Sequence, residues 1–455
     1  MSSQNTPLYS EEAFKQQLNR RHQRGRIGQA IFFLSNILAL IFLISLFAHI
    51  INQAFGYVIY EDRVRPADVA DRPLEELTEG ELVDILVERQ PGRVSVVLRD
   101  RLSQVEPAEF TTAPLSEILA GSDYPEEWAD LTIGDLEVEQ RVQILSDNLS
   151  QGDMLAVIID QVIQPTIVKS WSLIPSLVER DAIEAEYQES YPEDRLEFKA
   201  WVSWDFVTRS VSSSATTAGL RTALLGSFWI ISITAVTSLV LGVGAAIYLE
   251  EYARDNWINR TIEINIRNLA AIPSIIYGML GLAVFVRALG YFTSGQFIGI
   301  TDTNGRTALS AGLTLALLIL PIIIVTAQEA LRAVPSSIRE ASYGIGATRL
   351  QTVFRQVVPT ALPGIMTGVI LAMSRAVGET APLLVVGAST FIGIDPSGPF
   401  SKFTVVPIQI YQWTSRPEAE FKNVAAGAII VLLVVMLLLN GTAIILRNRF
   451  SRSQL

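Results

Sequence analysis

An arginine and a glutamate, Arg375 and Glu379, interrupt the apolar stretch LAMSRAVGETAPLLVVGA, which covers residues 371–388. A charge in the middle of a membrane costs at least about 2.5–3.5 kcal/mol, so such residues usually face a cavity or a partner. Arginine offers a planar fork of donors that matches the oxygens of an oxyanion. At a spacing of four, the two side chains are expected on one helical face, where the glutamate can hold the arginine when the path is empty.

An arginine that precedes a glutamate is the less favourable order for a pair within one helix, which suggests partners beyond each other. The pair therefore favours a substrate path for an anion. A structural ion pair that holds two helices together is the alternative, because buried membrane charges also serve assembly.

The composition is typical of a membrane protein. Of the 455 residues, 49% are hydrophobic, and the mean hydropathy of +0.35 is too high for an ordinary soluble chain. The absence of cysteine excludes disulfides and thiolate metal sites, and the two histidines argue against a histidine-based centre. The chain has no HExxH or GxSxG motif and no paired membrane aspartates, which argues against an intramembrane enzyme.

The charges divide the chain into two kinds of material. Residues 56–215 hold 33 acidic and 13 basic side chains, whereas the remainder holds 13 acidic and 22 basic ones. We therefore expect a first segment over 1–55, a soluble acidic insert over 56–215 and a membrane core over 216–455. No internal repeat is visible.

Six apolar segments are long enough to span a bilayer, because about 20 helical residues cover the hydrocarbon core. They are Ile27–Ile51, Thr222–Leu249, Asn268–Val286, Thr307–Gln328, about Pro359–Val386, and Asn423–Leu446. The first segment is too long for the apolar core of a signal peptide and has no clear small-residue cleavage site, so we expect a retained anchor.

Basic residues near the segment ends indicate the orientation. Arginines precede the first segment and follow the last, and the 332–355 loop carries four more. This pattern predicts that both termini and this loop are cytoplasmic. The 288–306 loop, with one basic residue, and the insert are then expected outside.

Local patterns indicate that the insert is folded. TEGELVDILVERQ (78–90) predicts a helix with a Thr78–Glu81 capping box. GRVSVVLRD (92–100) alternates as a strand does, whereas DMLAVIIDQVIQ (153–164) fits either element. The small residues of 210–219 are expected to form a linker back to the membrane.

The 332–364 loop predicts two short helices joined by a turn. Pro335 ends the preceding element, and Ser337–Glu340 predicts a capping box for the first helix. Gly344 and Gly346 break that helix, and Thr348–Gln351 caps a second one that runs to Pro359. Because both ends are tethered to the bilayer, the pair cannot easily reach a DNA groove. An ordinary amphipathic loop is the remaining alternative.

Within this loop, EASYGIGATRLQTVFRQVVP (340–359) resembles the EAA signature of ABC importer permeases. Glu340, Ala341, Gly346 and Pro359 match the signature, whereas Ser342 and Val358 replace its usual alanine and leucine. The resemblance implies that residues of about 335–347 form the coupling helix, which docks into a cytoplasmic ATPase. Since the chain contains no GxxxxGK[ST] motif, we expect a partner subunit to bind ATP, with no cofactor in this chain.

The segments AAIYLEEYA (245–253), PSIIYGMLGL (273–282) and RAVGETAPLL (375–384) resemble the A-type permeases of Pst phosphate importers. The resemblance begins at about residue 200. Two departures stand out: the insert of about 150 residues is larger than the external segment usual in that family, and Val325 stands where many members have arginine.

This resemblance implies an all-α polytopic membrane protein with six transmembrane helices, the MetI-like fold of type I ABC importer permeases, and a large extracytoplasmic insert between helices 1 and 2. It also implies a non-catalytic phosphate importer subunit in the bacterial inner membrane. The expected partners are a second homologous permease, two ATP-binding subunits, an extracytoplasmic phosphate-binding protein and the lipid bilayer, with no nucleic acid.

Two other functions remain open. A permease for another oxyanion, such as sulfate or molybdate, would use the same arginine, whereas a polyamine would not fit it. A secondary transporter or channel would also explain Arg375 and Glu379, but it would leave the cytoplasmic helix pair without a use.

Overall fold

The computed structural model describes residues 11–452, except 104–109, 120, 213, 301–303, 389–391 and 393. The expected linker over 210–219 and the expected 288–306 loop each include residues outside this set. Within the described part, five helices are long and apolar enough to cross a membrane, or six if one bent pair counts as a span. The five are Arg21–Gln53, Arg221–Tyr252, Ala308–Arg332, Arg349–Gly378 and Glu420–Arg449.

These spans correspond to labelled helices, some of which continue through a wider π-helical turn. They are α1 (Glu11–Gln53), α10 (Arg221–Ile247) with η6 (Tyr248–Tyr252), α14 (Ala308–Arg332), α16 (Arg349–Thr352) with η9 (Val353–Val357) and α17 (Val358–Gly378), and α20 (Glu420–Arg452). Shorter helices of this region are α13 (Gly290–Thr293), α15 (Ser336–Gly344), α18 (Ala381–Val386) and α19 (Val406–Thr414).

The third expected span is wrong at its beginning. Helix α11 (Trp257–Leu269) and helix α12 (Ser274–Gly281), which continues into η7 (Leu282–Ala288), meet at 108° instead of forming one helix through Asn268. Pro273 stands at this break, and the residue before a proline is disfavoured in helical conformation. The straight apolar helix of this region is therefore limited to Ser274–Ala288, and α11 is a separate amphipathic helix.

The fifth expected span is wrong at both ends. The second helix expected in the 332–364 loop does not end at Pro359 but continues into the span, so one helix runs from Arg349 to Gly378 and ends eight residues before Val386. Pro382 explains the end, because it has no N–H and its ring would clash with the carbonyl of Gly378, four residues earlier. Helix α18 begins beyond this break.

Helix α14 is the centre of the membrane bundle. Two thirds of its apolar window is buried within the chain, and it packs against α10, α12 and α17. A side chain added at Gly281 on α12 would overlap Thr314 of α14, and one added at Gly368 on α17 would overlap Thr326. Such small residues let membrane helices approach closely, which replaces the missing hydrophobic drive between them.

The insert contains a helical cluster and a small sheet. Its helices are α2 (Glu79–Arg89), α3 (Val94–Leu102), α4 (Leu115–Ile118), α5 (Val138–Asn148), α6 (Gln151–Ile158), α7 (Leu173–Val178), α8 (Arg180–Ser190) and α9 (Trp204–Thr208). The capping box of Thr78 and Glu81 is present, as expected. The expected strand over 92–100 is wrong, because this segment forms α3, which buries Val94, Val97 and Leu98 at helical spacing. The ambiguous 153–164 segment is helical.

The sheet has the strand order β2-β1-β3, and both pairs are antiparallel. Strand β1 (Phe55–Asp62) follows α1 directly and lies between β2 (Pro165–Ser170) and β3 (Arg195–Ala200). Side chains of β1 share a buried apolar cluster with Trp413 of α19 and Val424 of α20. The sheet is therefore packed onto the membrane helices.

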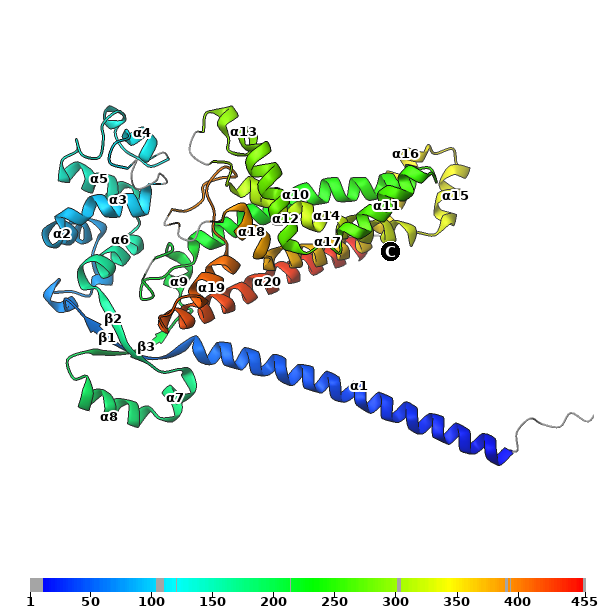
Figure 1. Cartoon of the computed structure of the whole chain (residues 1–455), viewed down its shortest axis with the longest axis horizontal. Helices are drawn as coiled ribbons and strands as arrows, with labels where there is room; N and C mark the ends of the chain where they lie inside the picture. The colour runs from blue at the N-terminus through cyan, green and yellow to red at the C-terminus, as the bar shows by residue number, and fades with distance from the viewer. Residues whose placement is uncertain are drawn as a thin grey trace, which may run out of the picture.

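The insert and the helices of the 332–364 loop lie at opposite ends of the membrane bundle (Figure 1). The helices α2–α6 gather at one end of the bundle, whereas α15, α16 and the C-terminus lie at the other end. Helix α1 leaves the bundle beside the sheet and runs away from it at an angle.

A partly buried ionic junction, in which Asp153 is the buried member, joins the insert to the bundle at Arg221, the first residue of α10. Arg221 donates hydrogen bonds to Asp153 of α6 (2.9 Å), to Asp395 in the loop before α19 (2.6 Å) and to the carbonyl of Thr208 (2.7 Å). Burial alone would raise the pKa of Asp153, but Arg221 and hydrogen bonds from Ser150 and Ser210 outweigh it, so the pKa lies below its ordinary value.

Two residues of the segment expected to be a linker back to the membrane, Ser210 and Thr217, take part in the same junction. Ser210 and Thr217 are buried. The Ser210 hydroxyl bonds to Asp153 (3.2 Å), and the Thr217 hydroxyl donates to Asp160 (2.6 Å). Burial raises the pKa of Asp160, although hydrogen bonds from the Thr217 and Ser212 hydroxyls and the charge of Arg101 oppose the shift.

We expect Arg221→Met to lower the free energy of unfolding by about 2–4 kcal/mol, because it leaves the buried Asp153 carboxylate without its cation. The same change at Arg180, whose ion pair with Glu184 is exposed, should cost less than about 1 kcal/mol. Thermal unfolding of each purified variant, monitored by size-exclusion chromatography of the heated samples, measures the two losses of stability. Equal losses for the two variants would contradict a structural role for the junction.

Candidate transport and coupling sites

Helix α15 and the turn after it form the tip of the bundle opposite the insert (Figure 1). Glu340 and Ala341 of α15 are exposed, as is Gly346. Gly346 has φ of +86°, a left-handed conformation that glycine adopts without strain. The glycine thus reverses the chain between α15 and α16, as expected.

One of the two expected capping boxes is present. The Thr348 hydroxyl accepts from the backbone N–H of Gln351, and the Gln351 side chain accepts from the N–H of Thr348. The expected box at Ser337 and Glu340 is wrong. Helix α15 begins at Ser336, with Pro335 as its N-cap, so Ser337 already lies inside the first turn and not at the cap position.

Two arginine–glutamate pairs fix this end of the bundle to the turn η6 that ends α10, one from α15 and one from α14, and the sequence reasoning missed both. Arg339 of α15 bonds to Glu251 (2.6 Å) and also donates to the carbonyls of Val334 and Leu331. Arg332, at the end of α14, holds Glu250 with two nitrogens, at 3.1 and 2.8 Å. The adjacent glutamates in YLEEY, just past a span, were the available signal.

These two pairs differ in burial. The side chains of Arg339 and Glu251 are 21% and 6% exposed, whereas that of Arg332 is 58% exposed. Both glutamates lie in the π-helical turn η6, and such turns concentrate at functional positions. The more buried Arg339–Glu251 pair therefore makes the stronger link to η6, and it is the one of the two that holds α15.

The two departures within the EAA-like segment have different surroundings. Ser342 is buried, and its hydroxyl shares a hydrogen bond with Thr352 of α16 across the turn (2.9 Å). An alanine could not make this bond. Val358 begins α17, and Pro359 is its second residue, directly after the π-helical turn η9. The loop thus continues without a break into the fifth span.

The tip also exposes apolar side chains. Ile345 is 88% exposed, and Tyr343, Leu350 and Phe354 are each more than 40% exposed. Monomeric surfaces rarely gather large apolar groups in this way unless a partner covers them. The tip is therefore suited to contact another protein.

Arg375 and Glu379 contact each other, although not on one continuous helix. Arg375 lies in the last turn of α17, and Glu379 is the extended residue that follows it. The Arg375 Nε donates to Glu379 Oε1 at 3.2 Å. The arginine side chain is 44% exposed within this chain, and that of the glutamate is 17% exposed. The guanidinium thus keeps donors for a further partner or a substrate.

Neighbouring helices hold the end of α17 in place. The hydroxyl of Ser374, next to Arg375, bonds to Asn440 of α20 at 2.6 Å. Beyond the break, Pro382 of α18 lies so close to α12 that a side chain at Gly278 would overlap it. The Arg375–Glu379 pair therefore stands at a break between two anchored helices.

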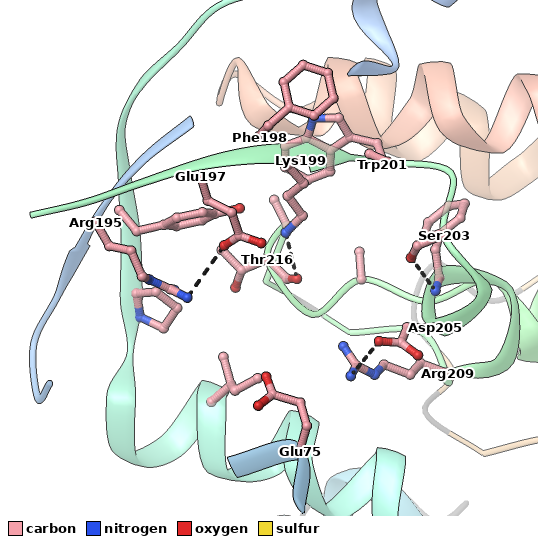
Figure 2. A pocket seen from close by; sticks show the side chains of 17 residues that line it. Glu75, Arg195, Glu197, Phe198, Lys199, Trp201, Ser203, Asp205, Arg209 and Thr216 are labelled. Carbon is pink, nitrogen blue, oxygen red and sulfur yellow. Dashed lines mark hydrogen bonds and ion pairs between the residues drawn. The ribbon is translucent and has the colours of Figure 1, made fainter. Parts of the chain in front are cut away.

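A second polar region lies at the base of the insert, in a cavity of about 340 Å³. Figure 2 shows Arg195, Lys199 and Arg209 directed into it, together with the carboxylates of Glu75, Glu197 and Asp205. Lys199 lies over the rings of Trp201 and Tyr60 and donates to the Thr216 carbonyl (3.1 Å). Burial lowers the pKa of Lys199 to about 8.

This cavity differs from the Arg375 region in its charge. The cavity is lined by as many carboxylates as cationic side chains. Two of the cations already form ion pairs, Arg209 with Asp205 and Arg195 with Glu197. The cavity thus lacks the excess positive charge that would attract a free anion, and Arg375 remains the better candidate.

Comparisons with known proteins identify the family. Residues 238–454 match the model of the binding-protein-dependent transport system inner membrane component. The probable ABC transporter permease protein YqgI of Bacillus subtilis is 32% identical over 256 residues, which cover 53% of this chain and 82% of the relative. The chain belongs to the binding-protein-dependent ABC permeases.

Other relatives of this permease carry more specific names. Phosphate transport system permease protein PstA 1 of Mycobacterium tuberculosis is 33% identical over 54% of this chain and 75% of the relative. PstA of Haemophilus influenzae is 32% identical over 52% of this chain and 79% of the relative. A solved inward-facing MetNI methionine ABC transporter has 20% identity and a TM-score of 0.38, and covers 50% of this chain.

These relatives confirm the resemblance to Pst A-type permeases and the expected class of helical, multi-pass membrane permease. Membership also places the chain among transport components that work with a binding protein and an ATPase. The roles of Arg375, Glu379, Glu340, Ala341, Gly346 and Pro359 stay predictions.

The buried pair between α15 and α10 yields a prediction. Arg339→Glu should cost about 3–5 kcal/mol in unfolding free energy and abolish uptake, because it places two carboxylates together at a buried position. Combining it with Glu251→Arg should recover part of both. Full recovery is not expected, because Arg339 also holds two carbonyls.

The exposed pair of Arg260 and Asp255 supplies the control, since Arg260→Glu should change neither quantity appreciably. Thermal unfolding and the initial rate of uptake by the assembled transporter are the measurements. A single Arg339→Glu variant with normal uptake would contradict the proposed link.

Proposed function

We propose that this permease is the membrane subunit of an ATP-driven phosphate importer. The observation that carries the proposal is the similarity, at 32–33% identity, to relatives named as phosphate transport system permeases, over about three quarters of their length. The arginine fork at Arg375 agrees with an anionic substrate. Import of another oxyanion, such as sulfate or molybdate, is the alternative.

In this proposal the chain pairs with a second, homologous permease, and two ATP-binding subunits attach on the cytoplasmic side. An external phosphate-binding protein delivers the substrate. The nucleotide is bound by the ATPase partners, and this chain is a non-catalytic subunit. ATP binding switches the permease pair from inward- to outward-facing, and hydrolysis resets it.

The complex lies in the inner membrane, with both termini cytoplasmic and residues 56–215 outside. The arrangement in Figure 1 supports this orientation, because the insert and α15 occupy opposite ends of the bundle and the C-terminus lies near α15. The arginines at both ends of the chain agree with it.

Helix α15 is the proposed coupling helix. Glu340, Ala341 and Gly346 form the surface that meets the ATPase, and the exposed Ile345 and Tyr343 add apolar contacts. A movement of the ATPase reaches α10 through the Arg339–Glu251 pair. It reaches the fifth span through the continuous helix from Arg349, past Pro359, to Gly378.

Arg375 and Glu379 are the proposed substrate-path residues. The half-exposed guanidinium binds phosphate oxygens, and Glu379 holds it when the path is empty. Glu379 also accepts a hydrogen bond from the P–OH group that hydrogen phosphate carries and sulfate lacks, so its carboxylate would favour phosphate. A structural ion pair that contacts the companion permease is the competing role for the same two side chains.

The coupling role can be tested by Gly346→Pro and by Glu340→Arg. Proline cannot adopt the positive φ of Gly346, and the arginine reverses the charge of the docking surface. Each variant should assemble poorly or hydrolyse ATP without phosphate uptake. Glu418→Arg makes the same charge change on an exposed loop before α20 and should have little effect. Normal uptake with both α15 changes would refute the coupling role.

The path role can be tested by conservative and reciprocal changes at Arg375 and Glu379. Arg375→Lys keeps the positive charge but loses the planar fork of donors. Phosphate uptake should therefore fall even though the charge is retained. Glu379→Gln should reduce the discrimination against sulfate. Uptake into vesicles, with sulfate as competitor, is the measurement.

The reciprocal exchange, Arg375→Glu with Glu379→Arg, separates the two roles. If Arg375 meets the substrate, the exchanged complex should assemble but stay inactive. A fully active exchanged complex would show instead that the pair only holds helices together.

A further inference from the structure

Helix α7 (Leu173–Val178) has its polar and apolar sides reversed for a helix on a soluble domain. Ile174, Leu177 and Val178 are 60, 68 and 76% exposed, and their spacing of three and four residues places them on one face. Ser176, by contrast, is buried against the protein. A water-exposed helix normally buries its apolar stripe and exposes its serine.

The outer end of α1 holds α7 in place. The amide of Asn52, in the last turn of α1, donates to the Ser172 hydroxyl (3.2 Å), and its oxygen accepts from the N–H of Ile174 (2.7 Å). The N–H of Tyr57, on β1, donates to the Ser176 hydroxyl (3.0 Å). Figure 1 shows α7 beside the point where α1 meets the sheet.

The length of α1 determines how deep its last turn, with Asn52, lies in the bilayer. From Ile27 to Gln53 the helix has no lysine, arginine, aspartate or glutamate. A rise of about 1.5 Å per residue makes this stretch about 40 Å long, which exceeds a hydrocarbon core of about 30 Å. Since Arg26 marks one edge, Asn52 lies in the head-group layer at the other.

We propose that the apolar stripe of α7 (Ile174, Leu177 and Val178) inserts into the bilayer surface beside α1. None of the apolar window of α1 is buried within the chain, so the stripe continues a surface that already faces outward. The next helix, α8, carries Asp181, Glu184, Glu186 and Glu189, and these carboxylates keep it in water. Short apolar faces at this level are typical of interfacial helices.

The insertion gives α7 a mechanical role. Because β1 follows α1 directly and bonds to α7, a helix seated in the lipid surface fixes the base of the insert at a constant height. This inference rests on membership of the permease family and on the depth of α1, and it does not depend on which anion is transported.

The absence of cysteine in this chain allows single labels to test the proposal. Val178→Cys, carrying an environment-sensitive nitrobenzoxadiazole probe, is examined in the complete transporter, reconstituted in phosphatidylethanolamine–phosphatidylglycerol vesicles. Leu46→Cys on α1 serves as the lipid-exposed control and Glu189→Cys on α8 as the water-exposed one. Size-exclusion chromatography of each labelled complex verifies assembly.

The proposal predicts that phospholipids with a nitroxide near the head group quench the probes at 178 and 46 and leave the probe at 189 bright. Aqueous iodide should quench only the probe at 189. Quenching of the probe at 178 by iodide alone would overturn the proposal, because the stripe would then lie in water. Protection from both quenchers would overturn it as well, because another protein surface would then cover α7.

Discussion

Close contact of α14 with its neighbours is the constraint on which the membrane bundle depends. Gly281 of α12 and Gly368 of α17 stand where any side chain would overlap a threonine of α14. Lipid supplies no hydrophobic drive between helices, so van der Waals contact at short distance must hold them together. A movement imposed on one of these helices is therefore passed on as a displacement of its neighbours, since a close-packed interface cannot deform gradually.

This packing explains how the tip of the bundle could act on its centre. Helix α15 is tied to α10 by the buried Arg339–Glu251 pair, and the helix that begins at Arg349 runs without interruption to Arg375. Only three residues beyond Arg375 the helix ends, and Glu379 lies in the gap before α18. The charged pair thus stands at the end of a rod whose other end is the proposed ATPase contact. At the opposite end, Arg221 ties the insert to α10 and to the loop before α19.

The sequence predicted the elements that depend on strong local signals. Charge and hydropathy located the first, second, fourth and sixth spans to within a few residues, and the Thr78 and Thr348 capping boxes are present as expected. The wrong predictions arose where two sequence signals competed and only one of them was used. In GRVSVVLRD, alternation suggested a strand, although Val94, Val97 and Leu98 also fit a helical face. In RAVGETAPLL, apolar character hid the break that Pro382 imposes. The Arg339–Glu251 and Arg221–Asp153 pairs join residues 88 and 68 positions apart, and no local pattern specifies such partners.

Transport by the reconstituted complex tests the central claim most directly. The chain, purified with its native partner subunits, is placed in vesicles that contain ATP, and the external binding protein is supplied with labelled phosphate. The account predicts phosphate accumulation that requires ATP hydrolysis and that excess sulfate or molybdate does not displace. Accumulation of sulfate or molybdate in preference to phosphate, or phosphate entry that continues without ATP, would contradict it.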